Sequence, residues 1–421
     1  MKKTVILTII LVIAILAILV GIFYWQLRDN DGDTVIPTVI PTPVLPAAPK
    51  SSAILQSIDS FPLSGSIALT ISHIDTPSTG PGGGYLSHDD IYLLDEDGSR
   101  LEKIIDYEPG NSIERISWSP QGRWLGFIRE DVQRLEYIDF ARSAGKNIST
   151  ITPKKGRDIF GYEWSPDENK LALIERGEKG SLYLNIFDLQ SGRRENEFAI
   201  IPPNEDRELY GFSNRFSNSY SAWIDNEHIV TIGKDKDGAF LLFQFTLSKG
   251  LKSKREIVPM GEDSFNPFIV SPDKESIAYF KQMESSEVGE GELWLSNVDG
   301  SGAKKIIDPK DNSPVIAYEV YDIKFSPDNR LLAYSHGAGD GVGFYILNRE
   351  TGNIVWAEEP ITFFEWLLDS KSLIAHSSFI SGASKMSIVG INGKLQKILQ
   401  QRDENALEFL GDFARFPVQQ Q

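Results

Sequence analysis

The sequence predicts an all-β protein: a seven-bladed β-propeller of four-stranded blades, preceded by one N-terminal transmembrane helix. Three observations predict this class. One short phrase recurs six times between residues 116 and 376, short apolar runs fill the chain to residue 418, and an uncharged apolar stretch opens it. We therefore divide the 421 residues into a short cytoplasmic end with an anchor (1–25), an extended Pro- and Thr-rich linker (26–57) and the propeller (58–421).

Residues 4–25 form the predicted membrane anchor. They carry no charge, and as a helix they would measure about 33 Å, enough to cross a hydrocarbon core of roughly 30 Å. Lys2 and Lys3 precede the span, which favours a cytoplasmic N-terminus and an extracytoplasmic body in the cell membrane. A cleaved secretory signal is the alternative, but it normally has an apolar core of only about 7–15 residues and a small-residue cleavage site.

The linker carries five prolines between Pro37 and Pro49. Such a segment favours an extended polyproline-like conformation that advances about 3.1 Å per residue. We expect it to hold the body away from the membrane.

The repeated phrase consists of an apolar anchor, a tight polar turn and an apolar strand. Its six anchors lie about 50 residues apart, which is the period of a propeller blade. Each phrase is followed by a second apolar run and a second tight turn, so every repeat supplies four strands. Several of these strands are apolar on both faces, as expected when each sheet is sandwiched between two others. The predicted structural anchors and turn prolines are Trp118, Pro120, Trp164, Pro166, Trp223, Pro272, Phe325, Pro327 and Trp366.

The six anchors open six blades, and residues 62–71 with 91–104 indicate a seventh. No anchor strand of the repeated type is clear for this blade. Residues 400–418 have room for one strand, so we expect the two chain ends to pair in one blade and leave no free sheet edge. Six or eight blades are the alternatives.

The phrases Trp118-Ser119-Pro120 and Trp164-Ser165-Pro166, with the runs that follow them, resemble those of TolB-like, WD-repeat-like bacterial β-propellers. The resemblance extends over roughly residues 60–400 and is akin to the propeller of dipeptidyl peptidases. It implies the fold rather than an activity. TolB has an α/β domain before its propeller and the peptidases have a hydrolase domain, whereas this chain has an anchor, a spacer and about 20 residues after its last blade.

Composition and motifs restrict the chemistry. The net charge of −17 argues against nucleic acid as a partner. The chain has no cysteine, no nucleophile elbow, no zinc-helix motif and no phosphate loop, so we expect no catalytic residue, cofactor or metal. The five histidines lack metal-ligand spacing in sequence, and we interpret His88-Asp89-Asp90 as a solvated loop.

Loop lengths predict which face binds. The turns within the repeated phrase are short, whereas longer connections on the other face are expected at residues 72–90, 199–220, 281–292, 308–320 and 335–343. Long loops on a rigid framework usually carry binding sites. Arginine and aromatic residues are enriched at interfaces, which makes six residues the candidate partner contacts: Arg207, Tyr210, Phe212, Arg215, Phe216 and Tyr220.

The sequence thus favours a membrane-tethered extracytoplasmic propeller that acts as an interaction scaffold for a protein, peptide or cell-wall partner. The alternative is a propeller-fold hydrolase or lyase that acts on envelope glycans or peptides through paired carboxylates.

Overall fold

The computed structural model describes residues 66–77, 85–95, 97–142, 147–203, 220–235, 238–253, 255–261, 268–282, 291–307, 319–338, 341–358, 361–378, 384–402 and 408–415. The predicted anchor and linker lie outside these residues. In the part of the chain that the structure describes, no helix is long and apolar enough to span a membrane.

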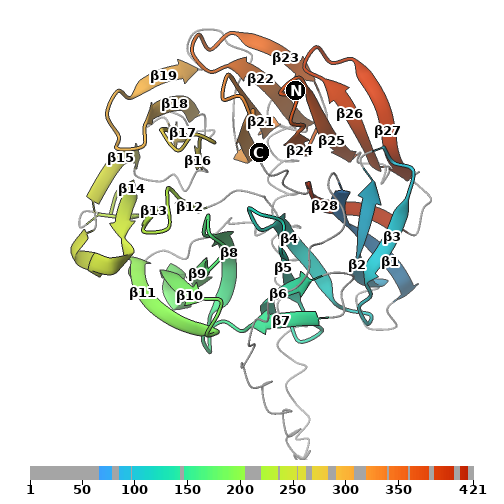
Figure 1. Cartoon of the computed structure of the whole chain (residues 1–421), viewed down its shortest axis with the longest axis horizontal. Coiled ribbons are helices and arrows are strands. Elements are labelled where there is room, and N and C mark those ends of the chain that lie inside the picture. The colour runs from blue at the N-terminus through green and yellow to red at the C-terminus, as the bar shows by residue number, and fades with distance from the viewer. Residues whose placement is uncertain are drawn as a thin grey trace, which may run out of the picture. The chain divides into compact units, whose positions relative to one another are not determined.

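The described strands form seven four-stranded antiparallel sheets, which confirms the predicted seven-bladed propeller. The first strand of each blade lies nearest the central axis (Figure 1). First strands of neighbouring blades contact one another, as β8 (Asp158–Trp164) does with β12 (Ser221–Trp223). Two short 3-10 helices connect strands within a blade. Glu178–Gly180 lies in blade 2, and Leu247–Ser253 lies in blade 3.

The blades are numbered here from the first complete repeat. Blade 1 is β4 (Ser112–Trp118), β5 (Leu125–Glu130), β6 (Glu136–Arg142) and β7 (Asn147–Ile151). Blade 2 is β8 (Asp158–Trp164), β9 (Lys170–Arg176), β10 (Leu182–Asp188) and β11 (Arg193–Ile201). Blade 3 is β12 (Ser221–Trp223), β13 (His228–Lys234), β14 (Phe240–Thr246) and β15 (Arg255–Gly261). Blade 4 is β16 (Phe268–Val270), β17 (Ser276–Gln282), β18 (Gly291–Asn297) and β19 (Lys304–Ile307).

The remaining blades follow in order. Blade 5 is β20 (Glu319–Phe325), β21 (Leu331–Ala338), β22 (Gly341–Asn348) and β23 (Ile354–Glu358). Blade 6 is β24 (Phe363–Trp366), β25 (Ser372–Ser378), β26 (Ser384–Gly390) and β27 (Leu395–Arg402). Blade 7 joins the last strand to the first three: β28 (Glu408–Arg415), β1 (Ser66–Pro77), β2 (Tyr85–Asp95) and β3 (Leu101–Ile105).

Blade 7 closes the ring with both ends of the described body. β28 pairs antiparallel with β1, from Ile67 opposite Arg415 to His73 opposite Glu408. The prediction that residues near the C-terminus supply the missing first strand is confirmed. Because β1 is paired with β28 on one side and with β2 on the other, it has no free edge.

The repeated turn has a local chemical cause. In blade 2, the Ser165 hydroxyl accepts the Lys170 N–H at 2.8 Å and donates to Asp167 at 2.7 Å, which closes the turn behind Pro166. The equivalent serines of blades 1, 4 and 5 accept the same type of backbone N–H: Ser119, Ser271 and Ser326. The fourth turn residue then adopts a left-handed backbone, at a φ of 57° in Glu168 and 63° in Lys274.

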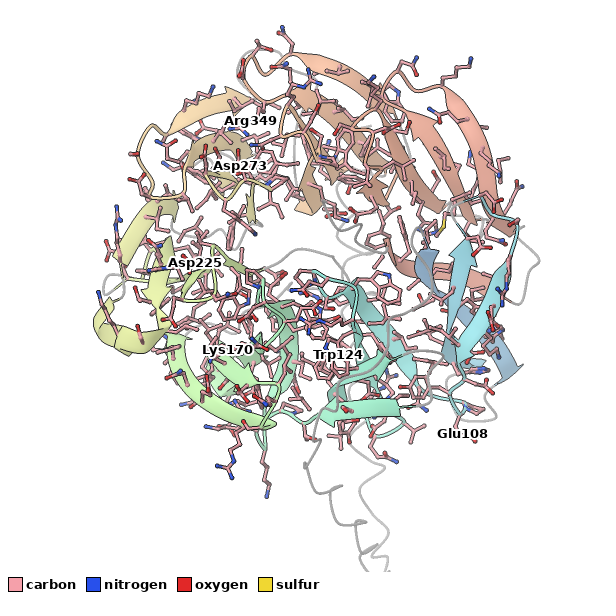
Figure 2. The ribbon with its side chains drawn as sticks, viewed as in Figure 1. Glu108, Trp124, Lys170, Asp225, Asp273 and Arg349 are labelled. Carbon is pink, nitrogen blue, oxygen red and sulfur yellow. The ribbon has the colours of Figure 1, made fainter. Side chains whose placement is uncertain are left out.

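Apolar side chains pack between neighbouring sheets (Figure 2), so the core is a series of clusters between blades. Polar side chains also join blades. Arg349, after β22 in blade 5, donates to the hydroxyl of Ser276 in blade 4 at 2.9 Å.

The prediction of a long loop is wrong for two of the five segments, because both contain paired strand residues. Residues 72–90 contain the end of β1 and the start of β2, and residues 335–343 contain most of a hairpin between β21 and β22. The glycines among residues 335–343 were the reason for the second wrong prediction, because glycine is typical of loops. Gly343 lies in a strand, where a Cβ would come within 2.6 Å of the His336 ring, so the glycine makes room for a buried imidazole. His88-Asp89-Asp90 is correspondingly part of β2 rather than a solvated loop, and Asp90 is fully buried.

Candidate functional site

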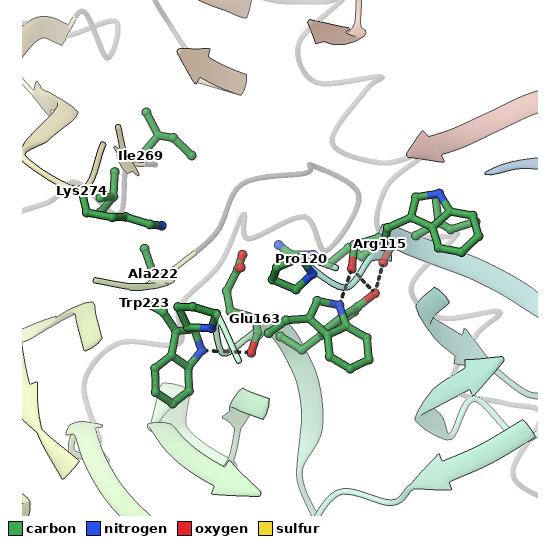
Figure 3. Close-up of a pocket in the computed structure, with 14 residues that line it drawn as sticks. Arg115, Pro120, Glu163, Ala222, Trp223, Ile269 and Lys274 are labelled. Atoms are coloured by element: carbon green, nitrogen blue, oxygen red, sulfur yellow. Dashed lines mark hydrogen bonds between the residues drawn. The ribbon is translucent and has the colours of Figure 1, made fainter. Parts of the chain in front are cut away.

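A cavity of about 350 Å³ lies where the first strands of blades 1 to 4 end, on the side of the repeated tight turns (Figure 3). Its walls combine buried aromatic residues with a few charged ones. The lining residues that matter below are Arg115, Tyr162, Glu163, Trp164, Trp223 and Lys274.

Hydrogen bonds between blades hold the tryptophan side chains of the cavity wall in position. The indole N–H of Trp164 donates to the Ser117 hydroxyl of blade 1 at 3.1 Å, and that of Trp118 donates to the Ala414 carbonyl of blade 7 at 3.1 Å. Trp366, which does not line the cavity, makes a similar bond to the Lys324 carbonyl of blade 5 at 3.2 Å. Each indole therefore both fills the space between two blades and satisfies a buried donor.

Arg115 is held at an irregular point of β4. The pairing of β4 with β5 shifts register between Glu114 and Ser117, and Arg115 lies inside this bulge with a φ of 52°. Its carbonyl accepts the Tyr162 hydroxyl at 2.7 Å, and its guanidinium lies 5.5 Å from the centre of the Tyr220 ring. A side chain at Gly161 would collide with that guanidinium, so the glycine leaves the room Arg115 occupies.

Lys274 and Glu163 bring opposite charges to the cavity. Lys274 occupies the left-handed position of the blade 4 turn, and both side chains point into the cavity (Figure 3). Burial lowers the pKa of Lys274, and the nearby Glu163 carboxylate acts in the opposite direction. The Lys274 side chain is still exposed to solvent, so the cavity walls remove only part of its hydration.

The described lining therefore offers two cations and one carboxylate. Glu163 is the only acid among the 14 residues that line the cavity. A paired-carboxylate mechanism would need a second acid within about 5–9.5 Å. What this lining can do is bind a ligand with an acidic group near Arg115 and Lys274 and a hydrogen-bond donor near Glu163.

The predicted partner contacts fall mainly outside the described residues: Arg207, Tyr210, Phe212, Arg215 and Phe216. Tyr220 is described and is only 7% exposed; its ring stacks on Phe160 at 4.5 Å and belongs to the core between blades 2 and 3. Binding through the long-loop face stays a prediction.

Five of the predicted structural anchors also line the cavity: Trp118, Pro120, Trp164, Pro166 and Trp223. Phe325 and Trp366 end the first strands of blades 5 and 6 and are buried; Pro272 and Pro327 lie in the turns of blades 4 and 5. Sequence reasoning missed Arg115, Glu163 and Lys274. A usable signal existed, because Glu163 directly precedes an anchor and Lys274 follows a Ser-Pro-Asp turn.

One group of three side chains among the described residues could hold a metal: His73, His88 and Asp90. It lies in blade 7, which contributes no residue to the described cavity lining.

Fold and cavity together define a seven-bladed β-propeller protein with an axial pocket. No protein-family model matches the chain, and no curated protein matches it. Solved structures share the fold. One is the β-propeller domain of the trilobed protease from Pyrococcus furiosus, which has an open velcro topology. It is 15% identical to this chain, and the match covers 82% of this chain and 94% of that domain, with a TM-score of 0.52.

A putative 6-phosphogluconolactonase from Bacteroides fragilis is 14% identical over 82% of this chain and 98% of its own, with a TM-score of 0.51. TolB from Acinetobacter baumannii is 13% identical over 83% of each chain, with a TM-score of 0.44. The two neighbours with TM-scores above 0.5 share the propeller fold that the repeated phrase predicts. At such identities the likeness concerns the fold alone.

Proposed function

We propose that this protein is a membrane-tethered extracytoplasmic propeller that binds a segment of a partner protein in the axial cavity. The observation that supports this most directly is the convergence of Arg115, Glu163 and Lys274 on one cavity whose walls are fixed by inter-blade hydrogen bonds. A volume of about 350 Å³ lies in the range of ligand pockets, about 300–1,000 Å³.

The charges favour a peptide with an acidic side chain or a free carboxylate. Arg115 and Lys274 would receive the carboxylate, and Glu163 would accept a backbone or side-chain N–H.

The tether is the second part of the proposal. Residues 4–25 would anchor the chain in the cell membrane with the N-terminus in the cytoplasm, and the proline-rich linker would place the propeller beyond the bilayer surface. Alkaline extraction of membranes should leave the full chain in the pellet, and the mature N-terminus should remain at residue 1 or 2. A mature N-terminus near residue 48 would contradict the anchor.

Photocrosslinking in intact cells tests the binding site. A photoreactive amino acid at Ala222, in the cavity wall, should give a discrete crosslinked species, and K274A combined with R115A should reduce its yield at least about fivefold. The matched control is the same photoreactive residue at Ile398, an exposed apolar position on β27.

A crosslink from Ala222 that survives the double substitution would contradict the role of the two cations. A crosslink that forms from Phe216 but not from Ala222 would overturn the cavity and favour the long-loop face instead.

A further inference from the structure

We propose that His73, His88 and Asp90 form a zinc site in blade 7, independent of the proposed peptide-binding function. The three residues lie on the hairpin of β1 and β2. The Asp90 Oδ2 atom is 3.3 Å from His73 Nε2 and 3.7 Å from His88 Nε2, and all three ligand atoms lie within 4.8 Å of one another.

These separations fit one small metal ion. Zinc bonds to imidazole nitrogen and carboxylate oxygen at about 2.0–2.2 Å with tetrahedral geometry, so two of its ligand atoms lie about 3.3–3.5 Å apart. The two measured distances to Asp90 are already close to that tetrahedral edge. The ligand nitrogens of the two histidines lie within 4.8 Å of each other, so zinc binding would bring them closer together by rotation of the imidazoles.

Strand register brings the three side chains together. His73 pairs directly with His88, and Asp90 lies two residues further along β2, so its side chain projects on the same face as that of His88. The imidazole rings stack with centroids 5.1 Å apart and an interplanar angle of 24°. The site therefore rests on a paired hairpin rather than on a loop, which keeps ligand positions defined.

The carboxylate is oriented for one oxygen to act as a ligand. Asp90 Oδ1 accepts the backbone N–H of Tyr107 at 3.1 Å, which directs Oδ2 toward the two histidines. Asp90 is fully buried, while the His73 and His88 side chains are 19% and 15% exposed. A metal can therefore reach the site from the histidine side and would meet a carboxylate already stripped of water.

Lys103 is the competing cation. Its ammonium pairs with Asp90 Oδ2, and it also lies 3.0 Å from Asp106 Oδ1, a carboxylate that is 75% exposed. Without metal, Lys103 neutralises the buried Asp90. When zinc binds, the lysine keeps Asp106 as its partner and moves away from Asp90, so the two cations alternate at one carboxylate.

The donor set selects the class of metal. Two imidazole nitrogens and one carboxylate suit zinc and related transition ions, whereas calcium and magnesium prefer all-oxygen shells. Three protein ligands leave a fourth tetrahedral position for water or for a group on a partner.

The test uses the full chain in detergent, stripped of metal and titrated with Zn²⁺ by calorimetry. We expect one zinc per chain, and H73A and H88A should each weaken binding at least about tenfold. The matched control is H228A, because His228 is partly exposed on β13 of blade 3, where its Nδ1 lies 2.9 Å from Asp225 Oδ2. Binding that H228A weakens as much as H73A would be adventitious and would overturn the site, as would the absence of stoichiometric zinc.

The variant K103M removes the ion pair between Lys103 and Asp90, and so tests whether Asp90 serves as a metal ligand or only as the partner of that lysine. Removing the competitor should tighten Zn²⁺ binding about tenfold or more, and zinc should raise the Tm of K103M more than that of the wild type. Tetrahedral Co²⁺ absorption in the visible range should appear in both proteins. An unchanged zinc affinity in K103M would contradict the proposed competition.

Discussion

The indole N–H of Trp223 donates to the backbone carbonyl of Glu163 at 3.2 Å, so the last residue of β12 is hydrogen-bonded to β8 in the preceding blade. Trp118 and Trp366 also donate to backbone carbonyls of the blade before them, and Trp164 donates to the hydroxyl of Ser117 in the blade before it. The repeated tryptophan thus acts as a directional link around the ring. At Trp223 the same link also fixes the backbone that presents the Glu163 carboxylate to the cavity.

Replacement of Trp223 by Phe keeps most of the apolar surface but removes this link. Loss of the hydrogen bond from Trp223 to the Glu163 carbonyl, together with the smaller ring, should lower the free energy of unfolding by about 1–3 kcal/mol. Urea unfolding measures the loss. W294F is the control, because the Trp294 indole donates to Glu292 on its own strand rather than to another blade. Equal losses in the two variants would contradict a special role for the inter-blade bond.

Replacement of Gly161 by Ala should disturb the cavity more than the fold. The new methyl group meets the Arg115 guanidinium, which must move away from the wall. We expect the Ala222 photocrosslink to fall at least about threefold while the Tm changes by only a few degrees. G177A is a matched control in the same blade, since its methyl would crowd Ser181 and Tyr183 instead. A normal crosslink in G161A would argue against Arg115 as a ligand contact.

Glu136 should make stability depend on pH. Burial, reinforced by repulsion from Asp158 and Glu114, raises the pKa of Glu136 to about 7, although the Ile159 N–H acts against the shift. The folded protein therefore holds this proton more tightly than the unfolded chain. The proton on Glu136 therefore stabilises the folded state in full below about pH 4.5, and this stabilisation is lost as the pH rises to about 7.

The variant E136Q tests that dependence, because glutamine keeps an acceptor but carries no charge. E136Q should be more stable than the wild type at pH 8 by on the order of 2 kcal/mol, below the full linkage value because the side chain keeps some contact with water. At pH 4 the two proteins should unfold at similar denaturant concentrations. A difference that is the same at both pH values would disprove the titration of Glu136.

Phe413 tests the closure of the ring. It lies on β28, is buried, and packs in the cluster that joins blade 7 to blade 6. F413A should cost about 3–5 kcal/mol of unfolding free energy, measured with denaturant. I398A is the control, since Ile398 is 46% exposed on the neighbouring β27 and its truncation should cost less than about 0.5 kcal/mol. A similarly small loss in F413A would mean that β28 contributes little to closure.

The fold was predictable because its determinants are local. Each Ser-Pro turn closes through its own serine and aspartate, as Ser165 and Asp167 do, and therefore leaves a readable phrase in the sequence. The partner strand for β1 was predictable from a missing first strand. The strand conformation at the ends of β1 and β2 was not predictable, because residues such as His73, His88 and Asp89 resemble loop sequence while pairing between the strands determines their conformation.

The sites were harder to predict because they depend on register and on contacts between blades. Arg115, Glu163 and Lys274 lie far apart in sequence and converge only when blades 1, 2 and 4 surround the axis. His73 and His88 lack metal-ligand spacing along the chain, yet they are directly opposite in the hairpin. Residues 80 and 81, a Gly-Pro pair, lie midway between them, and a hairpin centred there would have placed the histidines together.

The pairing of β28 with β1 also determines when this molecule can be completed during its synthesis. Of the strands in blade 7, β1, β2 and β3 are synthesised first. The strand that pairs with the inner edge of β1, β28, is synthesised more than 300 residues later. Until then the nascent chain exposes a strand edge that can pair with other chains. We therefore expect the unfinished propeller to depend on chaperones up to the last stage of translation.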